Sequence, residues 1–282
     1  MPYPIQLVSQ CSQQPVGTNS VNITSSCRVT HMKQQPILPT NFWTDLQGQN
    51  WFTSEHINMA MYLLSRQYPD IDGLSDCEYI NHIGLQTTFP SPKQKFIQII
   101  NKGGCHWITL SNIFCSASEV DVYDSMPSKM SPQDIRNVCH LTKHFNNNCL
   151  TINYQSVQLQ LGTTECGPFA VAFASSLARQ MDPASCSYDQ DSLRTEISKI
   201  FTSATFHPIE NGRKKKTKAK KENVLLYCSC NLNYIAHKND VGENMISCDN
   251  CKRWYHKACQ LISDEAFRKK RYVCSSCFST NG

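Results

Sequence analysis

Apolar and polar residues recur with two different periods over the first 210 residues of this 282-residue chain. A helical period follows Thr53, a residue suited to cap a helix N-terminus, because apolar side chains recur at Ile57, Met61 and Leu64. Pro69 cannot continue a helix, so we expect this first helix to end before it.

Short apolar or alternating runs predict strands farther along the chain. They are Phe96–Ile100, His106–Ile113, Glu119–Asp124 and Thr151–Gln160. A second helix is expected to begin at Ser131-Pro132, with the proline in its first turn, and a buried helix is expected from Cys166 onward. Strands mixed with helices in this order predict an α+β domain, to which we assign residues 41–208.

The segments outside this domain differ from it in composition. Residues 1–40 are rich in Gln, Ser, Thr and Asn and have little periodicity, so we expect a poorly ordered lead-in. Residues 209–224 include seven Lys or Arg and no apolar pattern, which predicts a charged, extended linker. Such a run suits a nuclear import signal or nucleic-acid contact as well as a merely solvated tether, and the sequence leaves these readings open.

Charge divides the chain in the same way. The formal net charge is +5, but residues 1–210 hold 12 Lys/Arg against 16 Asp/Glu, whereas residues 211–282 hold 15 against 6. A basic second part indicates a module that works near acidic partners or chromatin.

Cysteine usage indicates the compartment. Of the 16 cysteines, seven lie after Tyr227 in tight pairs, and the other nine are scattered singly, which argues against a disulfide framework. We find no secretory signal in the first residues and no apolar run long enough to span a bilayer. The sequence thus predicts an intracellular protein in a reducing compartment, with no membrane partner.

A histidine and an aspartate are expected to meet across a hairpin. If its turn centres near Ser116, Asp124 lies opposite Ile108, and His106 shares their face because side chains alternate along a strand. A carboxylate there accepts the imidazole N–H and sets the tautomer, as the orienting member of a catalytic triad does.

Cys166 falls where a strand-like segment gives way to a helix. A helix N-terminus and a nearby imidazolium both favour a thiolate, Gly167 permits close approach, and Pro168 suits a first turn. The amide of Gln160 is a candidate to stabilise an oxyanion together with the backbone N–H of Cys166. Taken singly, each of these residues also suits a packed core.

Four motifs in register resemble the SUMO-specific (ubiquitin-like-protein-specific) cysteine protease family, which is related to the adenoviral protease. The motifs are His106-Trp107, Tyr123-Asp124-Ser125, Gln160 six residues before Cys166-Gly167, and the segment Asn50–Asn58. The resemblance implies a permuted papain-like α+β fold and cleavage after a diglycine at the C-terminus of a ubiquitin-like modifier. It also implies that Trp51 and Trp107 flank a narrow tunnel for the modifier tail.

Eight metal-ligating residues cluster in the last 55 residues. They are Cys228, Cys230, Cys248, Cys251, His256, Cys259, Cys274 and Cys277. Eight Cys/His ligands suffice for two tetrahedral zinc sites, and a segment this short needs the metal to fold. The sequence predicts two structural zinc ions within residues 225–280.

The ligand spacing resembles the PHD finger, a chromatin reader. The resemblance implies interleaved sites, one holding the first ligand pair with His256 and Cys259, the other the remaining four cysteines. It also implies a methyl-lysine cage, whose positions here are Tyr227, Tyr234, Met245 and Trp254. Aromatic faces attract quaternary ammonium groups, so the expected partner is a histone H3 tail methylated at lysine 4, with Asp240 and Glu243 near its arginine.

Together these patterns predict a nuclear cysteine protease that a zinc finger directs to chromatin. Two alternatives remain open. One is a protease of a mobile element or virus that processes a polyprotein, and the other is a chromatin-binding protein without catalysis. The sequence does not choose among SUMO, a NEDD-type modifier, ubiquitin and a polyprotein site.

Overall fold

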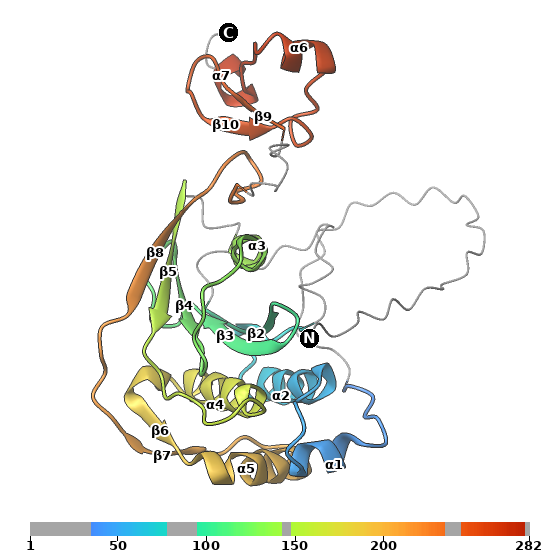
Figure 1. Cartoon of the computed structure of the whole chain (residues 1–282), viewed down its shortest axis with the longest axis vertical. Helices are drawn as coiled ribbons and strands as arrows, with labels where there is room; N and C mark the ends of the chain where they lie inside the picture. Colours follow the sequence, from blue (N-terminus) through green and yellow to red (C-terminus); the bar gives the residue numbers. More distant parts are fainter. Residues whose placement is uncertain (1–34, 78–94, 143–147, 235–243, 280–282) are drawn as a thin grey trace, which may run out of the picture.

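A computed structural model describes residues 35–77, 95–142, 148–234 and 244–279 of the chain (Figure 1). The expected lead-in at 1–40 lies almost wholly outside these residues, as do Asp240 and Glu243. Within the described residues, no helix has the length and apolar character that crossing a membrane requires.

A six-stranded sheet organises the first part of the chain, in the order β1-β2-β3-β4-β5-β8. The strands are β1 (Asp72–Gly73), β2 (Phe96–Lys102), β3 (His106–Ser111), β4 (Glu119–Tyr123), β5 (Cys149–Gln155) and β8 (Lys220–Leu225). β2, β3 and β4 form an antiparallel meander, and β4 pairs with β5 in parallel. The strands expected from the alternating runs are present, although the last ends at Gln155.

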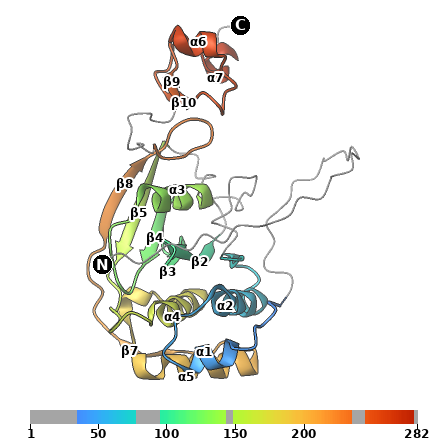
Figure 2. The ribbon, with the colours of Figure 1, turned by 45° about the vertical axis from the view of Figure 1, so that its right-hand side comes forward.

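Helices pack on both faces of this sheet (Figures 1 and 2). On one face lie α2 (Ser54–Gln67) and α4 (Cys166–Ala178), covered in turn by α1 (Phe42–Gln47) and α5 (Gln190–Ser203). On the other face lies α3 (Pro132–Leu141). The mixed architecture confirms the predicted α+β class.

The helix starts follow from local sequence. Thr53 caps α2 in a capping box with His56, and the helix ends before Pro69, as predicted. Ser131 caps α3 through a hydrogen bond from the backbone N–H of Asp134, with Pro132 in the first turn.

The helix that begins at Cys166 is the centre of the larger apolar core. Every residue of α4 is buried, and its helix is apolar all round because it is enclosed by the sheet on one side and by α2 and α5 on the other. Thr109 on β3 donates a hydrogen bond to the carbonyl of Ala170 at 2.9 Å, which ties the helix to the sheet. A smaller core lies between the sheet and α3.

The interpretation of residues 209–224 as an extended linker is wrong. The segment contains β7 (Glu210–Arg213), which pairs with β6 (Cys186–Tyr188) beside a short 3-10 helix, η2 (Pro183–Ser185), and it also supplies most of β8. β8 pairs with β5 over six residues, and the Tyr154 hydroxyl donates to Glu222 Oε2 at 2.6 Å. Charged side chains suit an exposed edge strand, since they discourage pairing with other chains.

The C-terminal module follows β8 directly. It contains a two-stranded ribbon of β9 (Met245–Ser247) and β10 (Trp254–His256), and two short helices, α6 (Asp264–Arg268) and α7 (Ser275–Ser279). Its small core is built from cysteines with Tyr255 and Tyr272 rather than from aliphatic residues. So little apolar burial agrees with a module that depends on metal to fold.

Candidate active site and zinc centres

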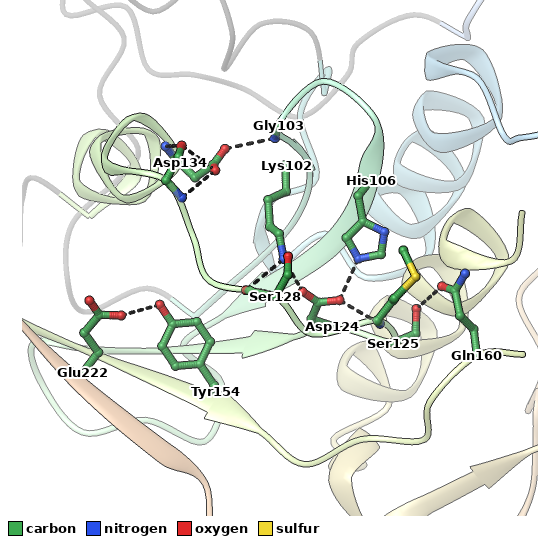
Figure 3. A network of polar contacts seen from close by, with 12 residues as sticks. Lys102, Gly103, His106, Asp124, Ser125, Ser128, Asp134, Tyr154, Gln160 and Glu222 are labelled. Carbon is green, nitrogen blue, oxygen red and sulfur yellow. Dashed lines mark hydrogen bonds and ion pairs between the residues drawn. The ribbon is translucent and has the colours of Figure 1, made fainter. Parts of the chain in front are cut away.

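The β3–β4 hairpin brings His106 and Asp124 together. The pairing of Thr109 with Tyr123 places Asp124 opposite Ile108, as the sequence predicts. The His106 Nε2–H donates to Asp124 Oδ1 at 2.6 Å, and both residues are buried (Figure 3). This geometry fixes the ring with its other nitrogen, Nδ1, directed away from the carboxylate.

His106 and Asp124 each shift the pKa of the other. Burial disfavours a charged imidazole, but the hydrogen bond to Asp124 and the nearby Cys166 outweigh it and raise the pKa of His106 to about 9. Burial likewise disfavours the Asp124 carboxylate, yet hydrogen bonds from His106 and Lys102 keep its pKa below the usual value. At neutral pH the imidazolium–carboxylate pair is therefore the stable form.

Cys166 lies next to this pair at the first residue of α4, with 2% of its surface exposed. Within the described residues, His106 Nδ1 has no hydrogen-bond partner at ideal geometry, and Cys166 is among the groups that raise the imidazole pKa. The thiol therefore faces the free side of the ring. Cys166 thus lies between the imidazole and the first turn of a helix, the surroundings in which reactive cysteines are found.

Gly167 has a packing role beside the thiol. A Cβ at this position would lie 2.4 Å from the Cβ of Phe52, which no side chain tolerates. The absence of a side chain lets Phe52 close over the start of α4, in agreement with the close approach expected from the sequence.

Gln160 is held firmly near the same helix start. Its Oε1 accepts from the Ser125 hydroxyl at 2.7 Å, and its Nε2 donates to the carbonyl of Gly162 at 3.0 Å. An amide nitrogen has two protons, so one N–H remains for another acceptor. Gln190 adds a clamp by bonding both the N–H and the carbonyl of Leu161.

The two tryptophans expected at a tunnel differ in exposure. Trp107 is buried at 5% exposure and donates from Nε1 to the carbonyl of Phe52 at 2.8 Å, whereas Trp51 is 48% exposed. The bond ties the Trp51–Phe52 segment to the strand that carries His106. A role for both residues in binding a substrate tail stays a prediction.

Arg194 on α5 joins this segment to the residue before the candidate nucleophile. Its Nε donates to Glu165 Oε1 at 3.0 Å, and its terminal nitrogens donate to the carbonyls of Asn50 at 2.8 Å and Thr164 at 3.1 Å. The guanidinium also lies 5.1 Å from the centre of the Phe52 ring. One side chain thus holds two loops in a fixed relation.

The sequence analysis did not identify Lys102 or Arg194. Lys102 donates from Nζ to Asp124 Oδ2 at 2.6 Å (Figure 3). The Gly103-Gly104 pair is the signal that predicts a tight turn and hence places Lys102 opposite His106. No local signal identifies Arg194, since its partners lie 29 or more residues away along the chain.

The eight predicted metal ligands form two groups in the C-terminal module. Cys228, Cys230, His256 and Cys259 form one, and Cys248, Cys251, Cys274 and Cys277 the other, each with its ligand atoms within 4.8 Å of one another. This is the interleaved arrangement expected from the resemblance. Two S/N tetrads of this size fit two structural zinc ions.

The four residues expected to form a cage surround one cavity. Tyr227, Tyr234, Met245 and Trp254 line a space of about 310 Å³, and Trp254 is 48% exposed. Tyr234 is likewise 43% exposed, so the cavity has aromatic side chains that are open to solvent.

Comparison with known proteins agrees with the ligand pattern. Residues 228–277 match the family model described as PHD-finger. This segment is a PHD finger. Among curated proteins, the chain is 36% identical over 59 residues to the chromatin remodeling protein EBS of Arabidopsis thaliana, which covers 21% of this chain and 23% of that protein.

Two further curated relatives match over similar lengths. Lysine-specific demethylase phf2 of Danio rerio is 42% identical over 60 residues, covering 21% of this chain and 5% of its own length. Nucleosome-remodeling factor subunit NURF301 of Drosophila melanogaster is 40% identical over 67 residues, covering 23% and 2%. The chain thus spans less than a quarter of the length of these curated relatives.

Solved structures with a similar arrangement include SUMO protease domains. The C-terminal Ulp1 protease domain in complex with Smt3, the yeast ortholog of SUMO, is 10% identical with a TM-score of 0.48, covering 64% of this chain and 89% of that chain. The Chaetomium thermophilum Ulp1-like SUMO protease catalytic domain is 16% identical with a TM-score of 0.44, covering 63% and 83%. Values this low do not assign an activity, which has to be inferred from the site itself.

Proposed function

We propose that the α+β domain is a cysteine protease with Cys166 as its nucleophile. The observation that carries this proposal is the buried His106–Asp124 pair at 2.6 Å, with Cys166 at the helix N-terminus against the other side of the ring. A nucleophile, a base and an orienting carboxylate in this order form the constellation that acyl transfer requires.

The residues divide the reaction among them. The Cys166 thiolate attacks the scissile carbonyl and forms a C–S bond, while His106 protonates the leaving amine as the C–N bond breaks. Gln160 and the backbone N–H of Cys166 stabilise the negative oxygen of the tetrahedral intermediate. His106 then takes a proton from water, whose oxygen displaces the thioester sulfur and restores the thiolate. Asp124 orients the imidazole throughout.

The substrate we propose is a ubiquitin-like modifier, cut after its C-terminal diglycine. The four sequence motifs in register support this choice. The position of the Trp51 segment supports it as well, because hydrogen bonds from Trp107 and Arg194 hold this segment beside the candidate nucleophile. A channel bounded by two indoles would admit glycine and exclude residues that carry a Cβ.

We further propose that the PHD finger places this activity on chromatin, in the nucleus, by binding a histone H3 tail methylated at lysine 4. The half-exposed aromatic residues around the 310 Å³ cavity support this, because a quaternary ammonium group is attracted to aromatic faces. Contact of the basic segment with nucleic acid stays a prediction. Lys216 and Lys221 in this segment already pair with Asp182 and Glu119.

Covalent trapping tests the protease. The zinc-loaded protein is incubated with SUMO, a NEDD-type modifier and ubiquitin, each tipped with an electrophile, and adducts are measured by intact mass. We expect an adduct with one modifier, lost in Cys166→Ala and kept in Cys105→Ala, which removes an exposed thiol beside His106. If no probe reacts with the folded protein, modifier cleavage is wrong, and peptide-library cleavage then separates a polyprotein protease from a silent domain.

Peptide binding tests the reader. Calorimetry with histone H3 peptides that carry unmodified or trimethylated lysine 4 is expected to show preference for the trimethylated form. Trp254→Ala should remove this preference while both zinc ions stay bound, because the side chain lies outside the ligand sets. Equal binding of the two peptides would contradict the proposed cage.

A further inference from the structure

Lys102 and His106 are neighbours across a tight turn. They are paired in register at the ends of β2 and β3, and the three residues between them include Gly103 and Gly104, both at positive φ (63° and 80°). The Gly103 N–H donates to Asp134 Oδ1 at 3.1 Å, which fixes the turn to the start of α3. Residues paired in this way place their side chains on the same face of a sheet.

The lysine side chain ends on the carboxylate that orients the imidazole. Its Nζ lies 2.6 Å from Asp124 Oδ2 and 3.2 Å from the Ser128 carbonyl, whereas His106 engages the other oxygen, Oδ1, at 2.6 Å (Figure 3). The backbone N–H of Met126 also donates to Oδ1, at 2.9 Å. Both oxygens are therefore occupied, and the carboxylate is held against rotation.

A cation at this place does more than hold a carboxylate. Lys102 and Asp124 are each 6% exposed, so their charges act on the site with little screening by water. Among the residues that the structure describes, the charged and titratable groups around His106 are Asp124 after β4 and Cys166 on α4, with Lys102 of β2 on the far oxygen of Asp124. Because Lys102 pairs with the carboxylate, it offsets part of the negative charge that faces the imidazole.

We propose that Lys102 is a positioning residue of the active site, which fixes the Asp124 carboxylate for His106 and offsets its negative charge. The inference rests on the proposed cysteine-protease function. An aspartate that also pairs with a lysine attracts the imidazolium proton less strongly than an unpaired aspartate would, while it still orients the ring.

The consequence is a defined pH window for the reactive ion pair of Cys166 and His106. Removal of a buried positive charge makes all neighbouring groups hold protons more tightly. Without Lys102, both limbs of the bell-shaped pH profile should therefore move to higher pH. For a unit charge roughly 6 Å away at an effective dielectric constant of about 20, the expected displacement is about two pH units.

The test is the rate of Cys166 alkylation by iodoacetate, an anionic reagent that the His106 imidazolium attracts, as a function of pH, measured in the folded full chain by mass mapping of the Cys166 peptide. Lys102→Met and Lys102→Gln remove the charge, and Lys102→Arg retains it. Lys95→Met is the matched control, since Lys95 directly precedes the same strand but bonds the Asn112 carbonyl, away from the site. Circular dichroism verifies that each variant is folded.

We expect both limbs to rise by about two pH units in Lys102→Met and Lys102→Gln and to stay in place in Lys102→Arg and Lys95→Met. If Lys102→Met does not fold, the Lys102→Gln and Lys102→Arg pair carries the comparison. A folded uncharged variant with a lower rate but unmoved limbs would overturn the proposal and leave a purely structural lysine. A wild-type Cys166 no more reactive than the exposed Cys105 would overturn the protease function, and this inference with it.

Discussion

Replacing Arg194 with methionine should destabilise the α+β domain and loosen the start of α4. The Arg194 and Glu165 side chains are each only 12% exposed, and their N–O separation is 3.0 Å. Removing one partner of a buried ion pair leaves an uncompensated charge and typically costs about 3–5 kcal/mol. The total stability of a domain is about 5–15 kcal/mol, so this is a large fraction of it.

Carbonyl groups add to the cost. The Arg194 guanidinium bonds Glu165 and also donates hydrogen bonds to four backbone carbonyls, those of Asp45, Leu46, Asn50 and Thr164. Some of these are left without a donor in Arg194→Met, although water reaches the more exposed ones. Arg194→Lys keeps a charge for Glu165 but loses the forked donors, so we expect a smaller loss of about 1–3 kcal/mol.

Urea unfolding followed by tryptophan fluorescence measures these losses, because Trp43, Trp51 and Trp107 lie in this domain and only Trp254 lies in the PHD finger. For a slope of about 1–3 kcal/mol per M, the midpoint of Arg194→Met should fall by more than about 1 M. The double variant Glu165→Gln/Arg194→Met should recover part of the loss, because it leaves no unpaired charge. A loss below about 1 kcal/mol, or a double variant no more stable than Arg194→Met, would refute the reasoning.

Three further outcomes follow from other parts of the structure. Chelation of zinc should unfold residues 228–277 while the α+β domain stays folded, as amide NMR spectra would reveal, and loss of both signal sets together would contradict independent folding. Because the pKa of His106 is raised from 6.5 to about 9, the stabilisation of its charged form is complete below pH 6.5 and is lost as pH rises through 9. Alkylation of Cys166 by anionic iodoacetate, which the imidazolium attracts, should slow there, and at lower pH in Asp124→Asn. An unchanged limit in that variant would exclude the carboxylate as the cause. Gly167→Ala should lower the free energy of unfolding by about 1–3 kcal/mol, measured by thermal or urea unfolding, because the new Cβ would lie 2.4 Å from the Cβ of Phe52. An unchanged midpoint would show that the start of α4 shifts to accommodate the methyl group.

Much of the candidate site follows from local pattern. His106 and Asp124 meet because only one register of a hairpin with its turn near Ser116 places the apolar residues of both strands on the same face. The alternation of apolar and polar residues in the sequence therefore specifies this register. The start of α4 at Cys166 could be predicted from the apolar run that follows Cys166 in the sequence. The zinc tetrads follow from ligand spacing, because eight Cys/His residues in so short a segment have few other uses.

Tertiary structure alone determined which distant charged side chains pair with one another. Arg194 meets Glu165, and Lys216 meets Asp182, across 29 and 34 residues of chain, and no periodicity records such pairs. The composition of the basic run at 209–224 is typical of a free linker. In the structure, however, part of this run forms β8 and pairs with the edge of β5. Local patterns specify which face of an element is apolar, whereas the partner of an edge strand or of a buried charge depends on which distant segment the fold brings within hydrogen-bond reach.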